Sequence, residues 1–366
     1  MHSNEDHPAP KMSSRRVLTA TTVLLLIAVF LLVLSVVRSW RPAGSGRQNG
    51  FYVQTDDGVF YAAAGNGLAA ASREHIRLFT SSGKCVAQAD VKLRDGVCAG
   101  SSLVSVYYDM GENTLHALYP DGVYRLAELE SGATFADVNE TGLITVIMDK
   151  DGAGGSLLVM DTDLTPLFRW DSSSAVPVEA RTYGEDLLCV NTLDDAGSIL
   201  RFFRIDQTNE LGRLTLPGEV VIDFGFLSDG TVAAVTDSRL LLLREDGVIR
   251  SELSWEGSHL NAWSLRGRFA ALSTVSGQSG GVLTTLDASG KLLGSTPAPG
   301  SVRALHCCGE RLLVLFTGEE STLYTSDLEE LISFQPEEDV SQVFLLPDGR
   351  AFFAGDSGVT QIDFTR

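Results

Sequence analysis

Short apolar segments separated by small polar turns follow one another along most of the chain, and residues 220–255 show the pattern most clearly. This stretch divides into VVIDFGFLSDG, TVAAVTDS, RLLLLREDG and VIRSELSW. The third and fourth segments meet at Asp246-Gly247, and Asp-Gly between apolar runs is a strong hairpin signal. Residues 232–235 and 240–243 are apolar at successive positions, as in strands that are covered on both faces. The pattern therefore predicts a four-stranded antiparallel sheet buried on both faces.

The same unit repeats along the chain with a period near forty residues. The tight turn before each fourth strand occurs seven times, with steps of 39, 41, 45, 39, 42 and 39 residues. A regular series of such sheets is typical of a β-propeller, so we predict an all-β propeller. The markers used for these turns are Gly83, Gly122, Asp163, Thr208, Gly247, Ser289 and Leu328.

The two ends of the repeat region predict how the ring closes. The last segments, VSQVFLLPDG, RAFFAGDSG and VTQIDFTR, supply three strands of another blade and lack a fourth. Residues 51–55 (FYVQT) form a spare alternating segment at the other end. Because an open sheet edge is a liability, we expect FYVQT to pair beside VTQIDF and complete an eighth blade. Seven blades is the alternative, if the segment at residues 97–129 is irregular.

A long apolar run precedes the repeats. Residues 17–37, from Val17 to Val37, are 21 residues without a charge. As a helix they span about 30 Å, the thickness of a bilayer's hydrocarbon layer. A cleavable signal peptide would have a shorter apolar region and a small-x-small site, which the following Val-Val-Arg-Ser-Trp lacks. We expect a retained transmembrane signal anchor.

Basic residues flank this run almost equally, with three Lys/Arg on each side within residues 1–50. An apolar segment behind a basic cluster is typical of a secretion signal, so we expect a cytoplasmic N-terminus and an extracytoplasmic propeller. The predicted organisation is a cytoplasmic tail at residues 1–16, the anchor at 17–37, a flexible linker at 38–50 and the propeller at 51–366.

Charge narrows the class of partner. Residues 51–366 hold 22 Lys/Arg against 45 Asp/Glu, a formal charge of −23. Such an acidic domain repels phosphate groups, which excludes nucleic acid as a partner. The five cysteines match no zinc pattern. Cys85, Cys189 and Cys307 lie among apolar strand residues and are expected to be buried, and a Cys85–Cys98 bridge between neighbouring blades stays open.

The chain resembles the β-propellers of the WD-repeat and quinoprotein-like type, and most of all the single-pass, N-terminally anchored propeller proteins of unknown function in Gram-positive bacteria. The resemblance covers nearly all of residues 17–366 and rests on architecture and on strand–Asp/Ser–x–Gly–strand turns. The only Trp-Asp pair is Trp170-Asp171, and no Gly-His marks a blade start. The chain thus departs from true WD repeats, and the resemblance implies a fold but no functional residue.

No concentrated catalytic or metal-ligand constellation is present in the sequence, so we expect neither a metal nor another cofactor. The first hypothesis is a non-catalytic scaffold that binds a protein, peptide or cell-wall component at the cell envelope. The alternative is a propeller enzyme with its site in the central funnel, such as a lyase, a glycoside hydrolase or a quinone-dependent dehydrogenase. Four or more ionisable side chains converging in that funnel would favour the alternative.

One face of the ring is the predicted partner surface. In a propeller, the loops joining second to third strands share a face with the segments joining successive blades. These loops are longer and more variable here than the opposite turns, and functional loops usually are. Acidic and aromatic residues there suit a basic or sugar-rich partner, although a solvated acidic rim with tryptophans packed between blades is the simpler interpretation. The candidate residues are Asp149, Asp151, Trp170, Asp194, Asp195, Trp255, Trp263, Glu319 and Glu320.

Overall fold

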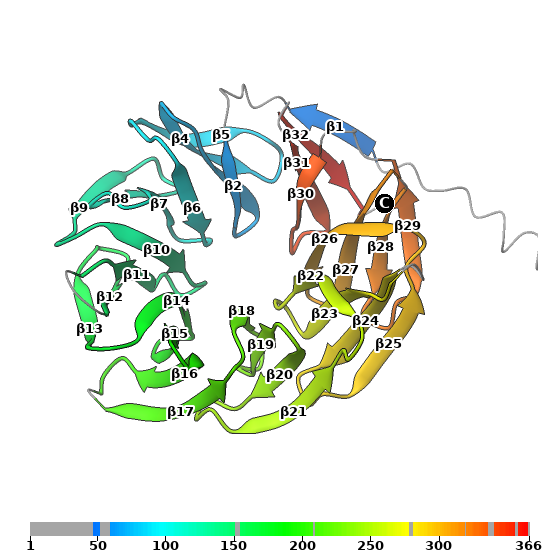
Figure 1. The fold of residues 1–366 in the computed structure, drawn as a ribbon. Helices are drawn as coiled ribbons and strands as arrows, with labels where there is room; N and C mark the ends of the chain where they lie inside the picture. Colours follow the sequence, from blue (N-terminus) through cyan, green and yellow to red (C-terminus); the bar gives the residue numbers. More distant parts are fainter. Residues whose placement is uncertain are drawn as a thin grey trace, which may run out of the picture. The chain divides into compact units, whose positions relative to one another are not determined.

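The computed structural model describes residues 47–51, 59–150, 154–207, 209–277, 281–318, 320–335, 340–355 and 358–364. These residues form eight four-stranded antiparallel sheets arranged as the blades of a ring (Figure 1). The eight-bladed propeller is confirmed, and the alternative of seven blades is wrong. The segment at residues 97–129 belongs to a regular four-stranded blade.

Each of the first seven blades uses four consecutive strands, and its first strand is the innermost one (Figure 1). Blade 1 contains β2 (Phe60–Ala64), β3 (Gly67–Ala71), β4 (His75–Thr80) and β5 (Cys85–Asp90). Blade 2 contains β6 (Gly96–Gly100), β7 (Ser105–Asp109), β8 (Thr114–Leu118) and β9 (Tyr124–Glu128). Blade 3 contains β10 (Ala133–Val138), β11 (Ile144–Met148), β12 (Gly155–Met160) and β13 (Pro166–Ser172). Blade 4 contains β14 (Val176–Tyr183), β15 (Leu187–Asp194), β16 (Gly197–Arg204) and β17 (Glu210–Pro217).

The remaining blades follow the same order until the chain closes on itself. Blade 5 contains β18 (Val221–Phe226), β19 (Val232–Thr236), β20 (Arg239–Leu243) and β21 (Ile249–Ser254). Blade 6 contains β22 (His259–Ser264), β23 (Phe269–Val275), β24 (Gly281–Asp287) and β25 (Leu292–Pro297). Blade 7 contains β26 (Ser301–Cys308), β27 (Arg311–Thr317), β28 (Ser321–Thr325) and β29 (Glu330–Phe334). Blade 8 contains β30 (Val340–Leu345), β31 (Arg350–Gly355), β32 (Gly358–Asp363) and β1 (Arg47–Phe51).

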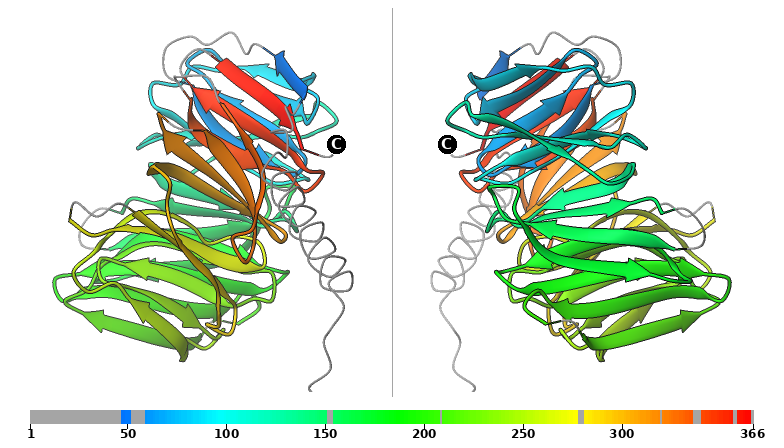
Figure 2. Two further views of the ribbon diagram at one scale, coloured as in Figure 1. Left: turned by 90° about the vertical axis from the view of Figure 1, so that its right-hand side faces the viewer. Right: turned by 90° about the vertical axis from the view of Figure 1, so that its left-hand side faces the viewer.

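The closing strand is β1, which pairs antiparallel with β32 from Arg47 opposite Asp363 to Phe51 opposite Val359. Both side views show this first strand (blue) beside the last strand (red) (Figure 2). Closure by the two ends of the repeat region is therefore confirmed, but its location differs. The strand occupies residues 47–51, not 51–55, and includes residues expected to belong to the linker. Outer strands of other blades are largely exposed, as in β9 and β21, so apolar alternation does not locate an edge strand.

The second strand of a blade is its most buried element, because neighbouring blades cover both of its faces. Every residue of β3, β7, β11 and β19 is buried. The buried side chains form eight clusters, and each cluster joins two adjacent blades. One of them packs Tyr61 and Leu68 of blade 1 against Phe352 of blade 8, which completes the ring. The hydrophobic core is thus distributed between blades and not gathered at one centre.

The turns between third and fourth strands lie where the sequence places them. In blade 5, Gly247 adopts a φ of 82°, and its amide donates to the Arg244 carbonyl at 3.0 Å. This left-handed conformation favours glycine, and an added Cβ would lie 3.0 Å from the Phe202 ring of blade 4. The Asp-Gly signal therefore reflects both a turn requirement and a close contact between blades.

The cysteines are free thiols. Cys98, Cys189 and Cys307 are buried, but Cys85 is exposed because it begins an outer strand, so its expected burial is wrong and no bridge joins it to Cys98. No helix within the described part of the chain is long and apolar enough to span a bilayer. Residues 17–37, the expected anchor, lie outside the described residues.

Deleting residues 47–51 tests the closure. The deletion leaves one edge of β32 unpaired and removes a five-residue ladder whose bonds contribute about 1 kcal/mol each. We expect the melting temperature to fall by roughly 5–10 °C and the protein to self-associate, measured by thermal unfolding and size-exclusion chromatography. A control that removes only residues 1–44 keeps β1 and should melt like the parent domain. Equal melting of the two truncations would contradict closure by β1.

Candidate functional site

One face of the ring carries the loops between second and third strands together with the segments that connect successive blades; we call it the loop face. Hydrogen bonds join the two sets of segments directly. The Gly111 amide donates to the Ala133 carbonyl at 2.8 Å, and the Trp255 amide donates to the Ser238 carbonyl at 3.2 Å. The prediction that both sets share a face is confirmed. These backbone hydrogen bonds attach the loops of blades 2 and 5 to the neighbouring connecting segments.

The acidic candidates are spread around this face. Asp149, Asp194, Asp195 and Glu320 are exposed, and they belong to blades 3, 4 and 7. Asp194 caps its own turn, because its Oδ1 accepts hydrogen bonds from the amides of Ala196 and Gly197. The loops therefore do not gather these carboxylates at one point. Asp151 and Glu319 lie outside the described residues.

The tryptophan candidates are separated from one another and pack between blades. Trp170 lies on the outer strand β13 with its ring centre 5.6 Å from that of Phe203. Trp255 is 7% exposed, and its indole N–H points to the Asp237 carbonyl at 3.4 Å. Trp263 lies on the innermost strand β22 and donates to Asp223 Oδ2 at 2.6 Å. Each tryptophan thus has a packing role, and a partner-binding role for them remains a prediction.

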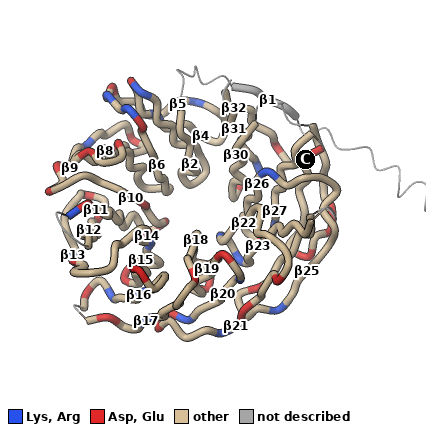
Figure 3. Tube along the Cα trace, viewed as in Figure 1, with Lys and Arg blue, Asp and Glu red and all other residues tan. Residues whose placement is uncertain are grey.

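Acidic positions occur around the whole ring (Figure 3), and on each face some of them cap turns while others are exposed without a side-chain partner among the described residues. On the face opposite the loop face, aspartates cap the tight turns by accepting hydrogen bonds from backbone amides two or four residues ahead. On the loop face, several exposed carboxylates have no ion pair or side-chain hydrogen bond within the described part of the chain. The turn-capping set is Asp121, Asp161, Asp229, Asp246, Asp287 and Asp348. The unengaged set is Asp149, Asp195, Asp237, Glu256 and Glu320.

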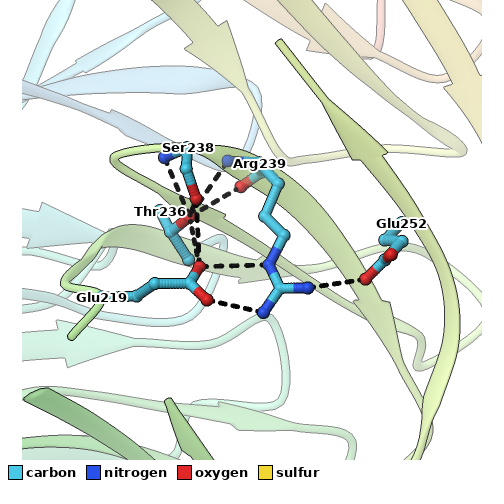
Figure 4. A network of polar contacts seen from close by, with 5 residues as sticks. All are labelled: Glu219, Thr236, Ser238, Arg239 and Glu252. Atoms are coloured by element: carbon cyan, nitrogen blue, oxygen red, sulfur yellow. Dashed lines mark hydrogen bonds and ion pairs between the residues drawn. The ribbon is translucent and has the colours of Figure 1, made fainter. Parts of the chain in front are cut away.

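A polar network fixes the connection between blades 4 and 5 on the loop face (Figure 4). Glu219 receives two hydrogen bonds from the Arg239 guanidinium, at 2.6 and 3.1 Å, and further bonds from Thr236 and Ser238. Arg239 also reaches Glu252 at 2.7 Å. Burial opposes ionisation of Glu219, but these donors hold its pKa below the usual range. The connecting segment therefore has a fixed position.

The innermost strands of blades 4 and 5 hold a second, more buried cluster that the sequence analysis missed. Arg181 Nη2 lies 2.7 Å from Glu179 Oε1 and 3.1 Å from Asp223 Oδ1. Its Nη1 donates to the Phe224 carbonyl, and the Phe224 ring lies beneath the guanidinium. Together with the indole of Trp263 on Asp223, this cluster ties blades 4, 5 and 6 to one another.

Protonation of this cluster follows from its burial. Desolvation raises the pKa of Glu179 to about 8; the charges of Asp223 and Asp137 add to the rise, and Arg181 opposes it. Glu179 is therefore protonated at neutral pH. The signal for the cluster was present, since Glu179 and Asp223 occupy the same place in successive repeats. From the sequence alone, charged residues on an otherwise apolar strand are readily interpreted as solvent-exposed side chains.

Other titratable side chains near the centre of the ring have structural partners. His306 on β26 accepts a hydrogen bond from the Leu345 amide of blade 8 at 3.2 Å. Burial, with a contribution from Arg266, lowers the pKa of His306 to about 3 and keeps the ring neutral. Among the described residues, no three His, Cys, Asp or Glu side chains are grouped so as to hold a metal ion.

Comparison with known proteins identifies one family and many similar folds. A family model described as "Family of unknown function (DUF5711)" matches residues 48–364. Sqt1 from Saccharomyces cerevisiae has a TM-score of 0.62 and 13% identity, covering 87% of this chain and 99% of that chain. BamB from Moraxella catarrhalis has a TM-score of 0.58 and 12% identity, with coverage of 87% and 99%. A chain of the mitotic checkpoint complex has a TM-score of 0.53 and 15% identity, with coverage of 74% and 86%.

No curated protein matches the sequence. The similar structures are all far below 25% identity, so they establish the WD-repeat-like and BamB-like propeller fold and nothing about activity.

Substituting Glu179 by Gln tests the protonation of the central cluster. Between pH 4.5 and about pH 8, Glu179 is ionised in the unfolded chain but protonated in the folded one, so the free energy of unfolding falls as the pH rises. Glutamine is neutral at every pH, and its amide group can both donate and accept a hydrogen bond, as a protonated glutamic acid does. We expect the variant to be more stable than the wild-type protein by roughly 2–3 kcal/mol at pH 8–9 and to lose most of that advantage near pH 5.

Urea unfolding over a pH series measures this difference. Glu185→Gln, at an exposed turn of the same blade, is the matched control and should follow the wild-type profile. Parallel profiles for Glu179→Gln and the wild-type protein would show that Glu179 ionises normally in the folded chain.

Proposed function

The chain belongs to this family of unknown function, and we propose that it is a non-catalytic scaffold that holds a protein partner on its loop face. The observation that carries the proposal is a set of exposed loop-face carboxylates that no other described side chain engages. The carboxylates of Asp149, Asp195, Asp237, Glu256 and Glu320 are exposed and have no ion pair or side-chain hydrogen bond within the described residues. Exposed carboxylates without a side-chain partner suit a surface with Lys and Arg side chains, because charge complementarity orients the two surfaces on binding.

The likeness to known folds is compatible with this role. One of the similar chains belongs to the mitotic checkpoint complex, which is an assembly by its name. In a propeller the blades form a framework that holds the surface loops in position, and binding residues often lie on loops held in this way. This analogy supports protein binding as a class of function and does not identify the partner.

Catalysis at the centre of the ring is the alternative, and one observation favours it: Asp137, Glu179, Arg181 and Asp223, all on innermost strands, lie near one another. Their arrangement supports a structural role more strongly. The carboxyl groups of Glu179 and Asp223 contact the same nitrogen of Arg181. Glycoside hydrolases need about 5 Å or more between their two carboxyl groups to accommodate the reacting atoms. Because Arg181 engages both carboxyl groups, they offer no free acid and base pair to a substrate.

The proposed location is the outer side of a membrane, with residues 17–37 as a single-pass anchor and residues 1–16 in the cytoplasm. This part of the proposal rests on 21 consecutive uncharged residues that follow a basic cluster and lack a cleavage site. A partner in the cell envelope, either a protein or a wall component, would then be within reach of the loop face.

The exposed Cys85 provides a test of orientation. A membrane-impermeant maleimide added to intact protoplasts should label Cys85 without detergent, because the propeller is placed outside the membrane. The control is Cys85→Ser, which removes the exposed thiol and should abolish the labelling. Labelling only after lysis would reverse the orientation, and release of the unlabelled protein from washed membranes would exclude the anchor.

Charge reversal tests partner binding on the loop face. A variant with Asp149, Asp195, Glu256 and Glu320 changed to Lys should lose a partner captured by crosslinking in cells by about tenfold or more, because four carboxylates become repulsive. Asp194 is retained since it caps its turn. The matched control changes four exposed acids of the opposite face to Lys and should keep the partner. Those four residues are Glu140, Glu185, Asp206 and Glu329. Equal capture by both variants would contradict the proposal.

A further inference from the structure

Bulges in the innermost strands define a ring of residues at the ends of these strands that lie toward the loop face. In six blades the pairing of the innermost strand with the second strand skips one residue near the end where the chain enters from the previous blade. A bulge leaves the extra residue unpaired and turns its side chain away from the regular pattern. Five of the six skipped residues are exposed, and Thr134 is half-buried. The six are Thr134, Val178, Ile222, Asn261, Arg303 and Ser341.

Blades 4 and 5 differ from the other blades in the residues at and just before the bulge. Val178 and Ile222 are the skipped residues, and Val176 and Val220 precede them by two positions. These four side chains are 41%, 46%, 48% and 45% exposed, respectively. The same two positions are Gly132 and Thr134 in blade 3, His259 and Asn261 in blade 6, and Ser301 and Arg303 in blade 7. We call Val176, Val178, Val220 and Ile222 the apolar patch.

The apolar patch lies on neighbouring strands that are held in place. Single exposed aliphatic residues are normal on a protein surface, but four at matching positions of adjacent blades are a local concentration of the kind that marks an interface. Glu179 and Asp223 follow Val178 and Ile222 directly and are joined through Arg181. The central cluster therefore fixes the spacing of the two strands beneath the patch.

Unengaged carboxylates border this patch. Val176 pairs with Leu193, which precedes the Asp194–Asp195 turn of blade 4. The Asp237 amide donates to the Val220 carbonyl at 3.3 Å, so the blade 5 loop touches the patch backbone. Asp195 and Asp237 are exposed, and neither has an ion pair or side-chain hydrogen bond within the described residues. An apolar centre with acidic neighbours is complementary to an apolar side chain flanked by Lys or Arg.

We propose that the protein partner docks through a short segment that places an aliphatic or aromatic side chain on the apolar patch and Lys or Arg side chains against Asp195 and Asp237. This inference rests on the proposed function and specifies its partner. The patch supplies the burial of apolar surface, and the carboxylates fix the orientation of the segment. The fixed strands beneath the patch limit the loss of conformational freedom on binding.

A phage-displayed library of random twelve-residue peptides, selected on the purified full-length protein, tests this docking surface. We expect the enriched peptides to combine an apolar residue with nearby Lys or Arg. Their affinity should fall about tenfold for the Val178→Ser/Ile222→Ser variant, since two exposed apolar side chains are lost. It should fall a few-fold for Asp195→Asn/Asp237→Asn, and this second loss should shrink at high salt.

The control is Val248→Ser/Ile249→Ser, which removes two exposed apolar side chains from the turn and outer strand at the other end of blade 5. It should bind the selected peptides like the wild-type protein. Peptides that bind Val178→Ser/Ile222→Ser equally well, peptides of acidic composition, or failure to enrich any sequence would each overturn the inference.

The outcome separates this inference from the proposed function. If crosslinking captures a partner that is lost on charge reversal of the loop face but kept by Val178→Ser/Ile222→Ser, the scaffold stands and the apolar patch is not its docking centre. If the crosslinked partner survives the charge reversal, the proposed function itself fails, whatever the peptides show.

Discussion

A single blade of this propeller cannot bury its own apolar faces, and the rest of the structure depends on that constraint. The second strand of a blade is apolar at successive positions, so both of its faces need a neighbour. Eight clusters of buried side chains meet the need, and each one lies between two blades. A row of blades would leave two apolar faces open at its ends. Closure by β1 on β32 is therefore part of the core and not an accessory to it.

The same constraint explains why charged side chains near the centre are satisfied in pairs. Innermost strands are partly covered by the adjoining blades, and a lone charge there would be costly to desolvate. Glu179 is kept neutral, Arg181 is held by acceptors from two blades, and His306 remains uncharged beside a backbone amide. These groups form hydrogen bonds and ion pairs between blades. Such bonds have a preferred geometry, which the apolar contacts between blades lack. They add fixed geometry to a core that is otherwise held by burial.

Much of this architecture could be predicted from the sequence because it rests on local patterns. Turn signals such as Asp246-Gly247 and successive apolar positions such as residues 232–235 predicted the blades and their number. The closing strand was misplaced because an outer strand is largely exposed and has no distinctive pattern, so FYVQT was the more visible candidate. The Glu179–Arg181–Asp223 cluster was missed because its members become neighbours only when blades pack. The apolar patch could not be predicted because it depends on bulges, and a bulge becomes visible only when the register between two strands is known.

The pairing of Arg47 with Asp363 also constrains how the chain folds. Seven blades consist of consecutive strands, so each can form from contacts that are close in sequence. The eighth joins the first described strand to the last one, and its contacts have the greatest sequence separation in the domain. During synthesis β1 emerges first and has no partner until β32 follows. Such non-local pairing is slow to form. The domain must therefore persist as an open series of blades, with two uncovered apolar faces, until β32 has been synthesised and can pair with β1.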